Sequence, residues 1–335
     1  MSTPTDLLYD THRRFHNYLR ISLIEKCNLR CTYCMPSSGI QLSPKESLMT
    51  SDEVFEIARV FVQHGVDKIR LTGGEPLLRK DLGVILERLS TLNVSLALTT
   101  NGVLLDRYID DLKRARLHKI NFSLDTLNPE SFNTITLRDQ FDRVHSNLQR
   151  VIKEGFDVKI NAVLLKNQNE EEIIDFIELT KSQSLSIRFI EFMPFQGNAW
   201  DQSKTVSLAS ILKRVEQFYG TDQVERLQDA PNDTAKNYKI RGFNGSFAVI
   251  STVTNPFCDS CNRIRLTANG KLRNCLFSDK EQDLLSALRS GTSIEPVIQK
   301  AIQLKRAVRA GLDSPETFED YHTHQSNRSM IKIGG

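Results

Sequence analysis

The chain has 335 residues, of which 39% are hydrophobic and 25% are charged, as is ordinary for a globular protein. Its formal net charge of +3 is too small to predict binding to nucleic acid or to a membrane surface. No uninterrupted apolar run approaches the length of a membrane span, and residues 1–20 lack the apolar core of a signal peptide. We therefore expect a cytoplasmic protein whose thiols stay reduced, with no nucleic-acid or membrane partner.

Extended, β-branched segments alternate with helical patterns in the first half of the chain. Strand patterns lie at 19–25, 68–72, 95–99, 119–125, 158–164 and 186–192. Helical patterns lie at 51–64, with Ser51 as the predicted N-cap, and at 81–91, 104–117, 142–154 and 170–181. Strands joined by crossover helices form a parallel sheet, and a complete eight-stranded barrel would need two more strands. The pattern predicts an α/β fold with a partial (open) TIM-type barrel of about six βα units.

A cysteine motif lies between the first strand and the first helix. Cys27, Cys31 and Cys34 have the spacing Cys-X3-Cys-X2-Cys. Three thiolates on one loop can hold an iron–sulfur cluster and leave one iron of a cubane open for chemistry. The alternative is a zinc loop, although zinc prefers four ligands and paired Cys-X2-Cys units. With Tyr33 before the last cysteine, the motif resembles the radical S-adenosylmethionine (SAM) superfamily, in which the open iron binds SAM.

Period-two alternation places the polar residues of the six strands on one face and the apolar residues on the other. On the polar face, Asp125 is the only acid. Five unpaired cations cannot lie in a dry core, so this face predicts a wet cavity that binds a polyanion such as a triphosphate. The alternative is a shifted register, in which some of these side chains extend outward to solvent. The five cations are Arg20, Lys68, Arg70, Lys159 and Arg188.

Loops at the strand ends add further candidates. Residues 72–76 read Thr-Gly-Gly-Glu-Pro, and successive glycines let the backbone approach a ligand closely. After the cysteine motif, this loop resembles the site for the SAM amino group in the superfamily. Thr99 and Ser123 end the next two strands, on the side where barrel active sites lie.

Past residue 197 the pattern changes, and we expect one domain over 1–197 and a C-terminal extension over 198–335. The extension is predicted to contain a helix at 207–219, strands at 237–241 and 247–251, and helices at 280–288 and 294–311. Cys258, Cys261 and Cys275 form a second set of three, and together the two sets contain all six cysteines. A zinc ribbon would need a fourth ligand, and no histidine lies near this set in sequence. The extension therefore predicts a second iron–sulfur site.

Two arginines follow the Cys258–Cys261 pair and share one face. Arg263 and Arg265 could hydrogen-bond an anion or an acceptor-rich base bound there. The alternative is a solvated basic face.

Taken together, these motifs resemble the GTP 3′,8-cyclase family, the radical SAM enzymes that open molybdenum cofactor biosynthesis. The resemblance covers essentially the whole chain. It includes both cysteine motifs, the loop at 72–76, Arg-Phe-Ile-Glu-Phe-Met at 188–193, Gly-Lys-Leu at 270–272 and the end Gly334-Gly335. A glycine pair at a terminus is by default disordered, but the resemblance implies that this tail reaches into the active site.

The resemblance implies a lyase with two [4Fe–4S] clusters, the first on Cys27, Cys31 and Cys34 and the second on Cys258, Cys261 and Cys275. It implies that SAM lies near Tyr33, Gly73, Gly74, Glu75, Ser123 and Met193. It also implies that the triphosphate lies at the five cations with Thr99 nearby, and that Arg263 and Arg265 flank the guanine. The implied catalytic set comprises Cys27, Cys31, Cys34, Arg263, Arg265, Gly334 and Gly335.

The implied reaction starts from a 5′-deoxyadenosyl radical that abstracts the hydrogen at ribose C3′ of GTP. Attack of the carbon radical on guanine C8 and one-electron reduction would give (8S)-3′,8-cyclo-7,8-dihydroguanosine 5′-triphosphate. The expected partners are GTP, an external electron donor and the downstream cyclic pyranopterin monophosphate synthase. The chain itself is expected to be a monomer or a homodimer.

The motifs leave three other functions to weigh, one catalytic and two non-catalytic. A radical SAM peptide-modifying enzyme with an auxiliary cluster would usually have more C-terminal cysteines and a peptide-binding domain, for which residues 1–18 are too few. A non-catalytic iron–sulfur carrier would close each cluster with four cysteines, and a nucleic-acid binder would need a stronger basic excess.

Overall fold

The computed structural model describes residues 6–36 and 39–334. In this part of the chain, the strands form one twelve-stranded sheet of order β12-β11-β10-β1-β2-β3-β4-β5-β6-β9-β8-β7. The strands are β1 (Tyr18–Ser22), β2 (Lys68–Thr72), β3 (Ser95–Thr100), β4 (Lys119–Ser123), β5 (Asp157–Leu164), β6 (Ser186–Glu191), β7 (Val224–Arg226), β8 (Lys236–Ile240), β9 (Ser246–Ile250), β10 (Arg263–Leu266), β11 (Lys271–Arg273) and β12 (Gln282–Asp283). The α-helices are α1 (Ser51–Gln63), α2 (Leu82–Ser90), α3 (Ile109–Arg114), α4 (Pro129–Thr136), α5 (Phe141–Lys153), α6 (Ile173–Glu178), α7 (Leu208–Tyr219), α8 (Leu284–Arg289), α9 (Glu295–Gln303), α10 (Pro315–Glu319) and α11 (Met330–Ile333).

The six predicted strands pair in chain order, and every pair is parallel. The partial, open barrel is therefore confirmed. Two further parallel strands come from the second half of the chain: β9, which the strand predicted at 247–251 matches but which was not predicted to join the barrel, and β10, which was not predicted. Strand β10 pairs with β1 and strand β9 pairs with β6, both in parallel. Because β9 and β10 are not neighbours in the sheet, the barrel remains open between them.

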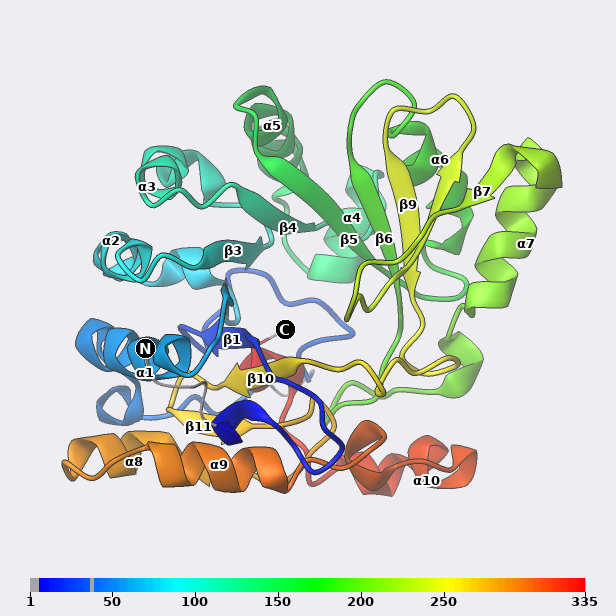
Figure 1. Cartoon of the computed structure of the whole chain (residues 1–335). Helices are drawn as coiled ribbons and strands as arrows, with labels where there is room; N and C mark the ends of the chain where they lie inside the picture. The colour runs from blue at the N-terminus through cyan, green and yellow to red at the C-terminus, as the bar shows by residue number, and fades with distance from the viewer. Residues whose placement is uncertain (1–5, 37–38, 335) are drawn as a thin grey trace.

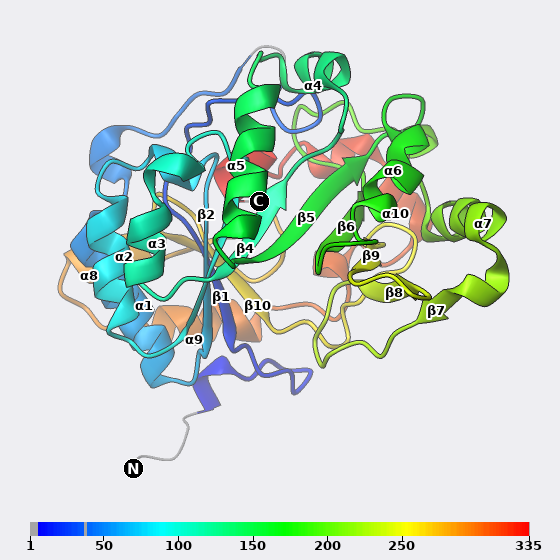
Figure 2. The same ribbon diagram turned by 90° about the horizontal axis from the view of Figure 1, so that it is seen from above.

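The helices cover the outer face of this curved sheet. Figure 1 shows α1, α2, α3 and α5 outside the arc of strands, with α8 and α9 beneath it. In the view from above, α6 and α7 lie beside β6 to β9 (Figure 2). The inner side of the arc is left for other groups, and the red C-terminal segment lies there.

The outward-facing residues of the strands form the hydrophobic core beneath the helices. Ile21, Ile69, Leu98 and Ile160 have no solvent exposure, as expected from the period-two alternation. The alternation stops where a strand stops. The strand predicted at 186–192 would place Phe192 on the same face as Arg188, but Phe192 follows the end of β6 and packs in a small apolar cluster outside the main core.

Several helix boundaries differ from the predictions. The N-cap of α1 is Thr50, not Ser51, because the Thr50 hydroxyl accepts from Glu53 N while the Glu53 carboxylate accepts from Thr50 N. The helix α4 was not predicted. It begins after Asn128, whose side chain accepts from two backbone N–H groups, and Pro129 occupies its first position.

The predicted helices of the C-terminal region are shorter than expected. In 280–288, Gln282 and Asp283 form β12, and α8 begins at Leu284 because the Asp283 side chain caps it by accepting from Ser286 N. In 294–311 the helix α9 ends at Gln303. Farther along this range, Arg309 and Ala310 have positive φ values of 37° and 62°, which an α-helix does not allow.

The packing of β6 against α6 yields a test of the core. Phe189 is fully buried, and its ring lies 6.2 Å from that of Phe176 at 86°. We expect Phe189→Ala to lower the free energy of unfolding by about 3–5 kcal/mol. The matched control is Phe218→Ala on α7, since Phe218 is 63% exposed. Urea unfolding monitored by circular dichroism would measure both, and equal effects would contradict the assigned core.

Candidate active site

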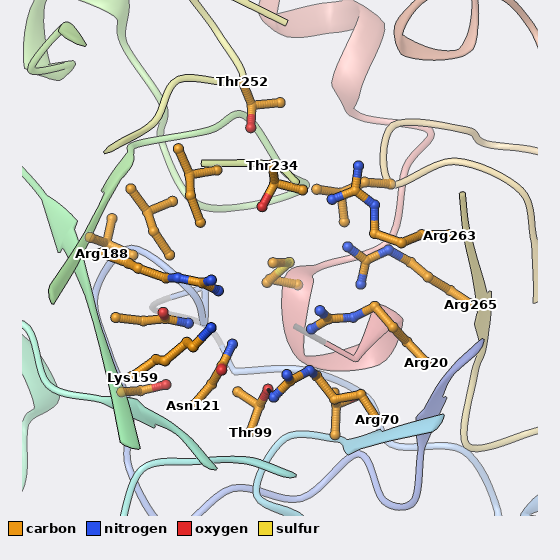
Figure 3. Close-up of a pocket in the computed structure, with 18 of the residues that line it drawn as sticks. Arg20, Arg70, Thr99, Asn121, Lys159, Arg188, Thr234, Thr252, Arg263 and Arg265 are labelled. Atoms are coloured by element: carbon orange, nitrogen blue, oxygen red, sulfur yellow. Dashed lines mark hydrogen bonds between the residues drawn. The ribbon is translucent and has the colours of Figure 1, made fainter. Parts of the chain in front are cut away.

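A cavity of about 600 Å³ lies inside the arc of parallel strands. The side chains that were predicted to contact a triphosphate all line it, and the labelled cations point into it from different strands (Figure 3). These residues are Arg20, Lys68, Arg70, Thr99, Lys159 and Arg188. The residues predicted to lie near SAM line the same cavity: Tyr33, Gly73, Gly74, Glu75, Ser123 and Met193. The fold thus brings both predicted groups into one space.

Strand register places three arginines side by side on the wall. Arg265 of β10, Arg20 of β1 and Arg70 of β2 are direct partners in consecutive parallel strands. Partners at one register level point to the same face of a sheet, and all three side chains are seen on one side of the cavity in Figure 3. The C-terminal region therefore extends the cationic surface that the first six strands begin.

Tyr18, which sequence analysis did not select, lies in the neighbouring row between Arg263 and Lys68. Its hydroxyl oxygen accepts from Arg70 Nε at 2.5 Å, and Lys68 Nζ lies 4.6 Å from its ring centroid. Burial raises the pKa of this phenol, but the charges of Arg70 and Arg20 outweigh that effect and lower the pKa to about 7. The predicted strand began one residue too late, and its alternation would otherwise have included Tyr18.

Among the described residues, carboxylates balance the positive charge of the cavity only in part, because seven cations but only four acids (Asp67, Glu75, Asp125 and Asp233) line it. The four cations on β2, β5 and β6 form no salt bridge there, and the buried Nε of Arg188 has no hydrogen-bond partner. Burial lowers the pKa of Arg20 to about 10, with repulsion from Arg70 and Arg263 acting in the same direction. Burial and the charge of Arg188 likewise lower the pKa of Lys159. A bound polyanion would relieve this repulsion.

The first cysteine set lies at one end of the same cavity. Cys27, Cys31 and Cys34 all line it and form no disulfide. Burial, followed by nearby negative charge, raises the pKa of Cys27 to about 11 and that of Cys34 to about 12. The charge of Cys27 would raise the pKa of both Cys31 and Cys34, so the three thiols need a cationic partner to ionise together, and iron supplies one. The donor set therefore fits an iron–sulfur cluster.

Tyr33 and Asp125 connect this loop to the barrel wall. Tyr33 Oη donates to Asp125 Oδ2 at 2.7 Å, and Asp125 Oδ1 accepts from Val163 N at 2.9 Å. Burial raises the pKa of Asp125 to about 6. The contact anchors the tyrosine, and with it the cysteine loop, to the segment that follows β4.

The two glycines at 73–74 allow a close backbone contact within the protein. Gly74 N donates to the carbonyl oxygen of Ile24 at 2.7 Å, and Glu75 N donates to that of Lys26 at 2.8 Å. A Cβ atom on Gly74 would lie 2.4 Å from Lys26 O, and one on Gly73 would lie 2.7 Å from Ile24 O. The glycines therefore hold the segment that leads into the first cysteine motif against the end of β2.

Glu75 is buried and its carboxylate is bound on several sides. It accepts from Thr100 Oγ1 at 2.8 Å, from Asn101 N at 2.8 Å and from Leu77 N at 3.0 Å. Burial nevertheless raises its pKa to about 7. Asn101, in turn, approaches Cys27 with its Nδ2 at 3.7 Å from Sγ, so Glu75 helps to place a donor beside the first cysteine.

The second cysteine set lies behind the wall formed by β10. Its neighbours Phe257, Asn262, Arg263 and Leu276 line the cavity. Burial would raise the pKa of Cys261, but the charges of Lys305 and Arg263 lower it to about 6. Three free thiols, one of them favoured as a thiolate, fit a second cluster.

The C-terminal tail turns into the cavity. Met330 and Ile331 line it, and the carbonyl oxygen of Gly334 accepts from Arg265 Nη1 at 2.9 Å. Gly334 has φ +84°, and a Cβ atom there would lie 2.7 Å from both Ser22 Cβ and Thr72 Oγ1. Gly335, the last residue of the predicted catalytic set, lies outside the described residues.

A loop from the second half of the chain adds lining residues that sequence analysis did not select. The segment 230–234 between β7 and β8 contributes Asp233 and Thr234, and Thr252 follows β9. The polar composition of this loop was visible in the sequence. Its position over the cavity follows only from the pairing of β9 with β6.

Two family models match consecutive parts of the chain. The Radical SAM superfamily matches residues 21–180, and Molybdenum Cofactor Synthesis C matches residues 185–310. The chain is 44% identical to GTP 3′,8-cyclase, mitochondrial, of Arabidopsis thaliana, over 99% of this chain and 84% of that protein. It is 39% identical to GTP 3′,8-cyclase of Peptoclostridium acidaminophilum, over 98% of both proteins.

Other relatives are longer than this chain. Molybdenum cofactor biosynthesis protein 1 of Homo sapiens is 42% identical over 97% of this chain and 51% of that protein, so the chain spans about half of its length. Among solved structures, Streptococcus suis SuiB bound to S-adenosylmethionine matches with a TM-score of 0.63 and 18% identity, over 90% of this chain and 69% of that one. This likeness shows a shared fold.

No helix in residues 6–36 and 39–334 has both the length and the apolar composition that crossing a membrane requires.

The glycine contact yields a second test. We expect Gly74→Ala to destabilise the protein by about 1–3 kcal/mol and to reduce iron uptake at the first cysteine set, because the new methyl group would displace the segment 24–26. The control is Gly83→Ala in α2, where the nearest atom to a new Cβ lies 3.8 Å away and alanine suits a helix better than glycine. Iron content per chain and thermal unfolding would be compared. Full iron uptake by Gly74→Ala would show that the contact is dispensable.

Proposed function

This chain belongs to the GTP 3′,8-cyclase family of radical SAM enzymes. We propose which residues of its cavity bind each part of GTP, SAM and the two clusters. The chain is an enzyme of this kind, with GTP as substrate, SAM and two [4Fe–4S] clusters as cofactors, and a role in molybdenum cofactor biosynthesis. The observation that carries the assignment of roles is the single cavity of about 600 Å³. The first cysteine set lines it, the second lies behind β10, and cations line the wall between them.

The triphosphate of GTP is proposed to bind the cations of β1, β2, β5 and β6. Arg70 is held rigidly for this role, since its Nε donates to Tyr18 and its Nη1 donates to Leu98 O at 2.8 Å. Lys159 and Arg188 lie on the opposite part of the wall in Figure 3. An anion between the two groups would contact both, which favours a ligand with several phosphate groups over a single carboxylate.

The guanine is proposed to lie near β10. Arg263 and Arg265 are next to the second cysteine set in sequence and line the cavity. The guanidinium of Arg263 stacks on Phe257, with its Cζ 4.8 Å from the ring centroid, so its orientation is set before a base arrives. Cys258, Cys261 and Cys275 would hold the second cluster on the far side of this wall.

SAM is proposed to lie at the end of the cavity formed by the first cysteine loop. Cys27, Cys31 and Cys34 would hold the cluster, and with SAM bound the pair supplies a 5′-deoxyadenosyl radical. The chain's own task is to place the ribose C3′ of GTP close to that radical and to exclude water. Ser123 and Met193 lie in the part of the lining that could contact SAM.

The tail is proposed to complete the substrate site. Gly334 binds Arg265, one of the two arginines at the proposed guanine position. Its left-handed backbone fits between Ser22 and Thr72 only without a side chain. The tail thereby sets the position of Arg265 before substrate binds.

Two further partners are proposed from the chemistry of the reaction. A reductant outside the chain must supply the electrons, and the downstream cyclic pyranopterin monophosphate synthase would consume the product. We propose the cytoplasm as the compartment, supported by the six free cysteines. The oligomeric state, monomer or homodimer, and the division into 1–197 and 198–335 remain predictions.

The central test is mass spectrometry of an anaerobic reaction with iron-reconstituted protein, SAM, a reductant and GTP. We expect 5′-deoxyadenosine together with a new product isomeric with GTP. Deoxyadenosine without a GTP-derived product would support radical SAM chemistry but would overturn GTP as the substrate.

In the same assay Cys275→Ala should retain SAM binding and lose the cyclised product. Normal product formation by that variant would show that the second cluster takes no part in the reaction.

A separate prediction concerns the tail. Gly334→Ala should lower turnover at least about tenfold, because the added methyl group would meet Ser22 and Thr72 and disturb the contact with Arg265. The control is Gly155→Ala, at a glycine with φ +80° where a new Cβ would meet no atom within 4 Å. It carries a similar backbone penalty away from the cavity. Equal rates for the two variants would remove the tail from the substrate site.

A further inference from the structure

We propose that Lys305 is a positioning residue that sets the reduction potential of the second iron–sulfur cluster, through a charged hydrogen bond to Cys261. The inference rests on the proposed assignment of Cys258, Cys261 and Cys275 to that cluster. Nothing in the motifs of the chain points to this lysine. It lies after the end of α9, in a range that was predicted to be an uninterrupted helix.

Lys305 is a buried cation with few partners. Its side chain is 4% exposed, and its Nζ donates to Cys261 Sγ at 3.3 Å and to the carbonyl oxygen of Arg263 at 3.0 Å. Within residues 6–36 and 39–334 it forms no salt bridge with a carboxylate. A buried ammonium without a counter-charge is strongly unfavourable. The sulfur of Cys261, as a thiolate bound to iron, is the anion that this position can provide.

The segment that carries Lys305 is fixed against the second cysteine set. Arg14 Nη1 donates to the carbonyl oxygens of Cys258 and Ala307, both at 2.8 Å, and its Nη2 donates to that of Arg306 at 2.8 Å. Its Nε is held by Asp10 at 2.6 Å. One buried arginine thus joins the cysteine loop to residues 306–307, so the distance from Lys305 to Cys261 is set by the fold.

The same segment approaches a second sulfur. The backbone N–H of Arg309 donates to Cys258 Sγ at 3.4 Å, in the stretch where Arg309 and Ala310 depart from helical geometry. Donors to the sulfurs of a cluster and nearby positive charge are known determinants of its potential. The end of the helix at Gln303 therefore lets residues 305 and 309 place hydrogen-bond donors on two sulfur atoms of the proposed cluster site.

The charges near Lys305 do not cancel its effect. Asp10 is already engaged by Arg14, and the His16 ring lies against Asp10 at 3.2 Å. Arg263 and Arg309 add positive charge beside Cys261 and Cys258. Of the acids, Asp313 acts on Arg309, and Asp259 is exposed to solvent. The net charge around the cluster from these side chains is positive.

The direction of the effect follows from charge. Reduction adds one electron to a [4Fe–4S]²⁺ cluster and gives [4Fe–4S]⁺, so the reduced form is the more negative one. A fixed cation and an N–H···S hydrogen bond stabilise that form more than the oxidised one, which raises the potential. Removal of the charge should therefore make the cluster harder to reduce.

The experiment is a redox titration of the anaerobic holoenzyme with dithionite, followed by electron paramagnetic resonance. Under the proposed function, the second cluster's signal is the one that GTP changes, whereas SAM changes the first. We expect Lys305→Met to lower the equilibrium constant for one-electron reduction of the second cluster at least tenfold, which is a shift of about 59 mV. Lys305→Arg, which keeps the charge, should retain most of the wild-type potential, and the first cluster should not move.

The matched control is Lys300→Met. Lys300 is an exposed lysine on α9, and its substitution removes the same formal charge as Lys305→Met. An unchanged potential in Lys305→Met, or an equal shift in Lys300→Met, would overturn the proposal. If Lys305→Met fails to take up the second cluster, Lys305→Gln replaces it in the titration, because glutamine keeps a hydrogen-bond donor but has no charge. An unchanged potential in Lys305→Gln would also overturn the proposal.

Failure of the underlying assignment gives a different result. If Cys275→Ala retains both resonance signals, the second cysteine set does not hold the cluster. If GTP perturbs neither signal in the wild-type protein, GTP does not bind beside a cluster, and the proposed position of the guanine is overturned. The titration of Lys305 variants is interpreted only once Cys275→Ala has lost the GTP-sensitive signal.

Discussion

The repulsion between like charges inside an open barrel is the constraint on which the rest of this molecule depends. An ordinary parallel barrel fills its interior with aliphatic side chains, but here β1, β2, β5, β6 and β10 turn arginines and lysines inward. Such an interior resists collapse, because the inward-facing cations cannot pack against one another without a counter-charge. The stability of the barrel must come from the opposite face of the strands, where Ile21, Ile69 and Leu98 are fully buried beneath the helices. The cavity is thus a consequence of where the charges are placed.

That arrangement explains why the two halves of the chain share one sheet. The pairing of β10 with β1 aligns Arg265 with Arg20 and Arg70, so the second half completes a surface that the first half begins. The pairing of β9 with β6 similarly brings Thr252 and the loop 230–234 to the cavity. The catalytic space is shared between segments that are more than a hundred residues apart in sequence.

Local patterns predicted much of this, and non-local pairing accounts for the remainder. The six strands and their inner faces followed from alternation, because the period of a strand is a property of its own residues. Thr50 was missed as an N-cap because Ser51 is also a capping residue, and only the Glu53 contact separates them. The parallel role of β10 could not be predicted from its four residues, since its partner lies far away in sequence. No sequence pattern pointed to Lys305, because its proposed role depends on the contact with Cys261 Sγ, which only the fold creates.

The pairing of β1 with β10 also fixes the distance between the two cysteine sets. The first cysteine motif begins five residues after Ser22, the end of β1, and Cys261 lies two residues before Arg263, the start of β10. Because the two strands are hydrogen-bonded in a fixed register, these short connections determine how far apart the two sulfur sites lie. An insertion of one residue within either connection would move a cysteine by about 3 Å. Natural length variation should therefore be confined to other loops, and the interval between the two metal centres should be among the least variable dimensions of the molecule.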